Sequence, residues 1–141
     1  MHPIHPMLVH VPVACWTLVP FSDLAAAGTS SAFFWQASAL LAAIGTGGAV
    51  LAASAGAMDY ARASAAAPRV VNSHAALMAT ALVLAGAGLI GRVGPGYAAL
   101  TPAPTWTVAL GIAAFLVMAV GAAFGGELVY GRGVGVRRDP Q

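Results

Sequence analysis

Four long apolar stretches alternate along the chain with short segments that are polar or rich in glycine and proline. They cover approximately residues 7–24, 33–58, 73–90 and 106–126. Each is close to the ~20 residues that a helix needs to cross a bilayer. The intervening segments carry turn-forming residues, such as Gly94-Pro95-Gly96. The pattern predicts one all-α domain over residues 1–141, a transmembrane four-helix bundle in up-down-up-down order.

The composition supports the same fold class. Hydrophobic residues make up 60% of the 141 residues and charged residues only 7%, with a mean hydropathy of +0.84. A soluble domain carries roughly 25% charged residues to cover its surface. The formal charge of +2 comes from arginines near the loops and tail. This favours membrane lipid as a partner and argues against nucleic acid.

The arginines predict the orientation in the membrane. In the predicted topology, the N-terminus, the second connection and the C-terminal tail share one side. That side collects Arg62, Arg69, Arg132, Arg137 and Arg138. The opposite side has Arg92, together with Asp23. The positive-inside rule therefore predicts a multi-pass protein of a bacterial inner membrane with both termini in the cytoplasm.

Two features inside the spans shape the expected bundle. Pro12 removes a backbone donor from the first helix and predicts a kink a little beyond His10. Small residues recur in the other spans, as in Gly121-x-x-x-Gly125, and they let helix backbones approach closely. This spacing indicates tight packing within the bundle and leaves a homo-oligomer open.

Ligand-type side chains gather at the predicted cytoplasmic ends of the helices. They are His5, His10, Asp59, His74 and Glu127. Asp59 is expected to end the second helix, His74 to begin the third and Glu127 to end the fourth. Ionisable groups at this depth usually face the bundle interior, pair with one another or bind a ligand. The order of the helices therefore predicts a polar cluster at one membrane face.

Three interpretations of this cluster remain open. In the first, His10 and His74 are the two axial ligands of a noncovalent haem b, with Arg62 or Arg69 meeting a propionate. In the second, a divalent zinc or iron ion binds some of the five side chains, namely His5, His10, His74, Asp59 and Glu127. In the third, the group only fastens helix ends: Asn72 or Ser73 caps the third helix, and Asp59 meets an arginine.

Catalytic interpretations are weaker than these. The sequence contains no His-Glu-x-x-His motif, and Cys15 has no charged neighbour that would activate its thiol. An electron carrier or binding protein is therefore expected rather than a catalyst.

Several motifs resemble a bacterial family of small four-helix membrane proteins, the domain-of-unknown-function family DUF2231. They are the His-Pro-rich segment His2–Pro12, the Gly56-x-x-Asp59-Tyr60 motif, His74 preceded by Asn72, and the segment Gly125–Val136. Some members of that family look fused to Rieske-type iron–sulfur domains, which implies an electron-transfer setting. This chain has no such domain, so the resemblance implies that any redox partner is a separate protein. The glycine-rich strip Gly131–Val136 is expected to fold back over the cluster.

Overall fold

The structure is a computed structural model that describes residues 4–94 and 103–134, without the side chains of residues 61 and 62. The described residues form helices and no strand. The elements are α1 (Ile4–Leu8), α2 (His10–Thr29), α3 (Ala32–Ala66), α4 (Pro68–Val93), α5 (Thr105–Gly126) and the π-helix η1 (Glu127–Gly131). Within them lie four helical stretches of 26, 29, 26 and 27 residues that are long and apolar enough to cross a membrane. The predicted four-helix transmembrane fold is confirmed.

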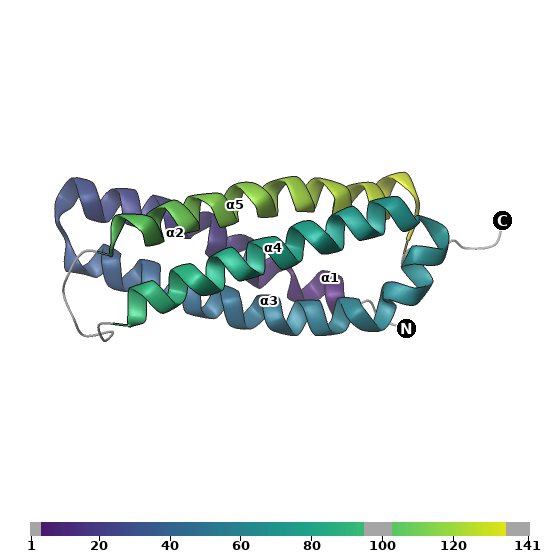
Figure 1. Ribbon diagram of the computed structural model, residues 1–141, viewed down its shortest axis with the longest axis horizontal. Coiled ribbons are helices and arrows are strands. Elements are labelled where there is room, and N and C mark those ends of the chain that lie inside the picture. The colour runs from purple at the N-terminus through teal and green to yellow at the C-terminus, as the bar shows by residue number, and fades with distance from the viewer. Residues whose placement is uncertain (1–3, 95–102, 135–141) are drawn as a thin grey trace.

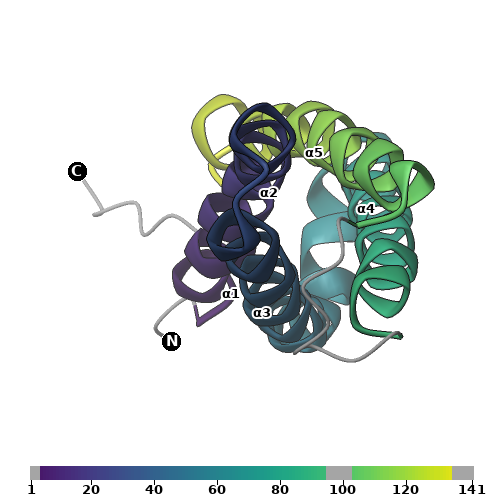
Figure 2. The same cartoon turned by 90° about the vertical axis from the view of Figure 1, so that its left-hand side faces the viewer.

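The four long helices lie side by side along the long axis of the molecule (Figure 1). Seen along that axis, they surround it in a ring (Figure 2). Each long helix packs against two neighbours, through the pairs α2–α3, α3–α4, α4–α5 and α2–α5. Helix α2 is therefore diagonal to α4, and α3 is diagonal to α5. Helix α1, the beginning of α4 and the end of α5 lie at the same end of the bundle (Figure 1).

The first span is interrupted at Val9, one residue before His10, whereas the kink was predicted a little beyond His10. Helix α1 ends at Leu8 and α2 begins at His10, with Val9 between them. Pro12 explains the break, because it has no N–H to donate to the carbonyl of Leu8 and its ring crowds that carbonyl. The disruption therefore falls in the turn that precedes the proline, on the N-terminal side of His10. The direction of α1 sets where His5 lies.

The predicted connection between the second and third spans is mostly helical, so the predicted boundaries were wrong there. Helix α3 continues past Asp59 to Ala66, and α4 already begins at Pro68. Only Ala67 separates them, with φ −151° and ψ 65°. Proline suits the first position of a helix and disfavours helical geometry in the residue before it. Two long helices therefore meet at a single non-helical residue.

This boundary also overturns the predicted capping of the third helix. Asn72 and Ser73 lie inside α4, which has no side-chain cap at its N-terminus. The amide oxygen of Asn72 instead accepts a hydrogen bond of 2.6 Å from the hydroxyl of Tyr60 on α3. The asparagine thus fastens α3 to α4 near their shared corner.

The segment after α5 folds back, as far as the structure describes it. The backbone N–H of Val134 donates a 2.9 Å hydrogen bond to the carbonyl of Leu128. Val134 packs against a small buried cluster formed by Ala67, Val71 and Leu128. The described part of the strip therefore folds back onto the α3–α4 corner. That the strip covers the ligand cluster stays a prediction, and its residues 135 and 136 lie outside the described residues.

Small residues set the spacing between the helices. The main buried cluster contains Trp16 and Met118 among alanines. Trp16 is only 3% exposed and lies directly against Gly45 of α3. A Cβ atom on Gly45 would come within 2.7 Å of the indole ring. Large apolar side chains such as Leu51 and Val83 instead cover the outside of the bundle, as a lipid-facing surface requires.

We expect Gly45→Ala to lower the free energy of unfolding by about 1–3 kcal/mol, the usual cost of overpacking a well-filled core. The control is Gly47→Ala on the same helix, where an added Cβ meets nothing within 4 Å. Thermal unfolding in mild detergent measures both. Equal stability of the two variants would contradict the packing of Trp16 on Gly45.

Candidate functional site

Two of the predicted ligand residues, His5 and His74, meet in the interior at one end of the bundle. His5 comes from α1, at the start of the first span, and His74 comes from α4. Their ring centroids are 6.4 Å apart, and the ring planes are almost perpendicular, at 84°. Both residues are half-buried. Segments far apart in the sequence thus bring two imidazoles together.

Each of these imidazoles is held by a backbone carbonyl of a neighbouring helix. The Nδ1 atom of His5 lies 2.7 Å from the carbonyl oxygen of Ala52, and that of His74 lies 2.9 Å from the carbonyl oxygen of Gly121. A carbonyl oxygen only accepts hydrogen bonds, so both Nδ1 atoms carry the proton. In the neutral rings, the Nε2 atoms therefore keep their lone pairs. This arrangement is typical of metal-binding histidines.

A glycine makes room for each ring. A Cβ atom on Gly56 would come within 3.0 Å of the ring of His5, and one on Gly125 within 3.1 Å of the ring of His74. Real Cβ contacts are rarely this short, so any larger residue would push the imidazole away. Each ring is thus set by two features of one helix, a carbonyl on α3 or α5 and a glycine one turn further along.

The remaining predicted ligands point elsewhere. His10 is exposed, and its Nδ1 atom donates to the carbonyl of Met7 at 3.2 Å. Asp59 is exposed two turns before the end of α3. Glu127 pairs with Arg132 at 3.3 Å, with both side chains about half exposed. Across residues 4–94 and 103–134, no three His, Cys, Asp or Glu residues form a group that could hold a metal ion.

The two arginines proposed for a propionate both come from the α3–α4 corner. Arg69 is exposed in the first turn of α4. Arg62 lies on α3, and its side chain is outside the described residues. Helix α4 begins six residues before His74. The histidine therefore lies deeper in the bundle than the helix start at which it was predicted.

A second polar cluster, which the sequence analysis did not predict, is buried towards the other end of the bundle. Arg92 on α4 forms an ion pair of 2.5 Å with Asp23 on α2, and the side chains are 3% and 0% exposed. Ser38 on α3 donates to Asp23 and accepts a 3.2 Å hydrogen bond from Nε of Arg92. A further guanidinium nitrogen donates to the carbonyl of Gly88. The charges are thus paired within the protein, as their burial requires.

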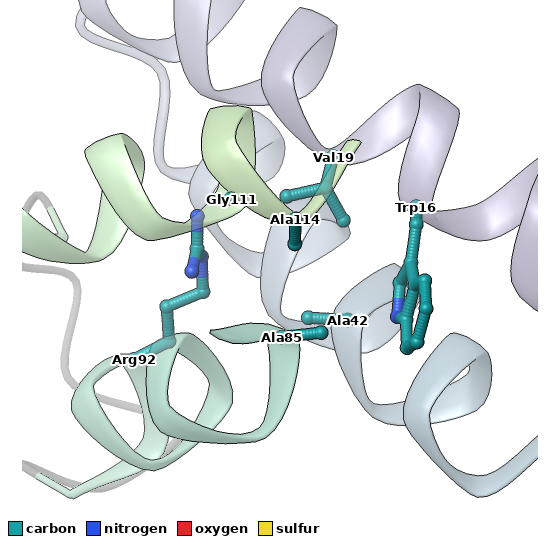
Figure 3. A pocket seen from close by; sticks show the side chains of 7 residues that line it. All are labelled: Trp16, Val19, Ala42, Ala85, Arg92, Gly111 and Ala114. Atoms are coloured by element: carbon teal, nitrogen blue, oxygen red, sulfur yellow. The ribbon is translucent and has the colours of Figure 1, made fainter. Parts of the chain in front are cut away.

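A narrow pocket lies between this ion pair and Trp16 (Figure 3). Its lining consists of Trp16, Val19, Ala42, Ala85, Arg92, Gly111 and Ala114. Arg92 and the indole of Trp16 stand on opposite sides of it (Figure 3). The indole N–H of Trp16 is buried without a hydrogen-bond partner among the described residues. An orphaned donor of this kind is uncommon in protein interiors.

The sequence did contain a signal for the ion pair. Asp23 and Arg92 were placed on the same predicted side, at the ends of the first and third spans, and they carry opposite charges. Unpaired charges at a span end are costly, so such residues generally pair with one another. The contact between His5 and His74 had no comparable signal, because the break at Val9 decides where α1 points.

Fold and site together define a small four-helix membrane protein with two polar contacts between its helices, a half-buried histidine pair and a buried arginine–aspartate pair. The family model of DUF2231, described as a predicted membrane protein, matches residues 1–138. The chain therefore belongs to this family, as the resemblance of its motifs had suggested. No curated protein and no solved structure matches it.

Breaking the buried ion pair should be strongly destabilising. We expect Asp23→Asn to lower the stability by about 3–5 kcal/mol, because it leaves the guanidinium of Arg92 buried without a counter-charge. The double variant Asp23→Asn with Arg92→Gln should recover part of that loss. Thermal unfolding in detergent tests this, and an unchanged single variant would show that the pair is not buried in the membrane-spanning protein.

Proposed function

We propose that this protein binds the iron of a b-type haem through the Nε2 atoms of His5 and His74 and serves in electron transfer. The site lies at the end of the bundle that carries Arg69 and Arg132, which the positive-inside rule places in the cytoplasm of a bacterial cell. The redox partner is a separate protein.

The observation that carries the proposal is the shared hydrogen bonding of the two rings. Both Nδ1 atoms donate to backbone carbonyls, of Ala52 and Gly121, and both Nε2 atoms are left as bases. Two neighbouring imidazoles with the same free nitrogen would provide the donor set of a bis-histidine haem. The ring that meets His74 belongs to His5, so the proposal assigns His5 rather than His10 as its partner.

The number of ligands favours haem over a bare ion. Zinc sites in proteins use three or four protein ligands, and no group of three suitable residues occurs among those the structure describes. Haem supplies four nitrogens of its own and needs only two from the protein.

The test is a reduced-minus-oxidised visible spectrum of protein purified in mild detergent from haem-sufficient cells. We expect sharp reduced-state bands from the parent, lost in His5→Ala and in His74→Ala. His10→Ala is the matched control, since its exposed ring bonds only to the nearby carbonyl of Met7, and it should keep the bands.

Three other results would change the assignment. Bands that survive in both His5→Ala and His74→Ala would exclude these axial ligands. A flat parent spectrum with stoichiometric zinc or iron by elemental analysis would replace haem with a divalent ion. A flat spectrum without metal, at ordinary thermal stability, would leave a noncatalytic scaffold or partner subunit whose histidines only lock two helices together.

A further inference from the structure

The two halves of the chain repeat the same contacts at a constant offset. The Nδ1 atom of His5 bonds to a carbonyl 47 residues later, and so does that of His74. A glycine makes room for each ring. Gly56 follows His5 in the sequence at the same spacing as Gly125 follows His74. A shift of 69 residues, the separation of His5 and His74, therefore superposes one half of the site on the other.

The same offset relates the second polar cluster. Asp23 shifted by 69 residues is Arg92, so the two partners of the buried ion pair occupy equivalent positions. Ser38 shifted likewise is Thr107, and both of these hydroxyl residues are 0% exposed. The α2–α3 hairpin thus corresponds to the α4–α5 hairpin, and the offset is the same before and after the connection, although α3 begins soon after α2 and the segment between Val93 and Thr105 is longer. Few residues are identical between the halves.

Equivalent residues that touch each other must lie on a symmetry axis. In a two-fold arrangement, a residue meets its own counterpart only where the axis passes between them. His5 meets His74 and Asp23 meets Arg92, about five turns apart along α4. The axis therefore runs along the bundle between the diagonal helices α2 and α4. Parallel repeats about an axis normal to the membrane are a known architecture of membrane proteins.

The departures from symmetry have a steric reason. Arg92 lies against Gly88 and Gly111, where an added Cβ would come within 3.0 Å of its guanidinium. The equivalent positions beside the shorter Asp23 hold Val19 and Ala42. The second hairpin thus carries the small residues that an arginine needs, and the first carries the larger ones that an aspartate allows.

We infer that the chain is a pseudo-two-fold repeat of one helical hairpin and that its ligand lies on the axis, held by two equivalent imidazoles. The ligand class rests on the proposed function: a metal centre with two like axial positions. His5 and His74 would hold such a centre as two equivalent protein ligands, and with both bound it would suit electron transfer rather than oxygen chemistry.

The first test compares Gly56→Ala with Gly125→Ala in the full-length, cofactor-free protein. Nitrogen-15 spectra of the labelled histidines report the Nδ1–H bonds without any haem. Each variant should perturb mainly its own histidine, His5 or His74, and by a similar amount. The controls are Gly47→Ala and Gly86→Ala, where an added Cβ meets nothing within 4 Å; they should leave both signals unchanged.

A response confined to one of the two variants, or to neither, would overturn the symmetric site. Equal responses in a protein that never binds haem would support the repeat while the proposed function fails. In protein that does bind haem, both variants should lower haem content to a similar degree. Carbon monoxide should leave the parent's reduced spectrum unchanged, and a shift on its addition would overturn the two-sided ligation.

A second variant tests the repeat away from the histidines. It exchanges Asp23 and Arg92 together with the small residues that lie beside each of them. It combines Asp23→Arg, Val19→Gly and Ala42→Gly with Arg92→Asp, Gly88→Val and Gly111→Ala. If the two sets of neighbouring residues are equivalent, this six-residue variant should unfold at a higher temperature than the control variant that exchanges only Asp23 and Arg92. An exchange no more stable than that control would contradict the inferred equivalence.

Discussion

The constraint on which the structure depends is the absence of water in the hydrocarbon core of the bilayer. A polar group inside a span must find its partner within the protein, because an unsatisfied one costs several kcal/mol. Thr17, Ser54 and Thr80 meet this requirement locally, each donating to the carbonyl four residues earlier. Longer polar side chains also reach other helices, as Arg92 reaches Asp23, and they draw those helices together.

Two such contacts organise the bundle, one towards each end. The histidine pair uses imidazoles and backbone carbonyls, and it leaves two basic nitrogens unused. The pair of Asp23 and Arg92 uses its charges on each other and on Ser38. The difference matters for function. The ion pair is closed to further ligands, whereas each histidine of the pair keeps one ring nitrogen with a free lone pair. This difference is the reason why we propose the binding role for the histidine end.

Small residues make both contacts geometrically possible. Lipid chains are as apolar as leucine, so close packing and hydrogen bonds hold the helices together rather than burial from water. Glycines stand where a helix meets a bulky ring or guanidinium, as Gly45 does beneath Trp16 and Gly111 beside Arg92. The high content of glycine and alanine thus serves specific contacts as well as general compactness.

By itself the sequence determined the membrane class, the four spans and the family, because those depend on length, hydropathy and local motifs. It also placed ligand-type residues at one predicted face. The tertiary structure decided which of them meet, since the break at Val9 and the continuation of α3 to Ala66 turn His5 inward while His10 and Asp59 stay exposed. Contacts across a bundle depend on how each helix is rotated about its own axis. A span that is apolar on every face has no sequence pattern that predicts this rotation.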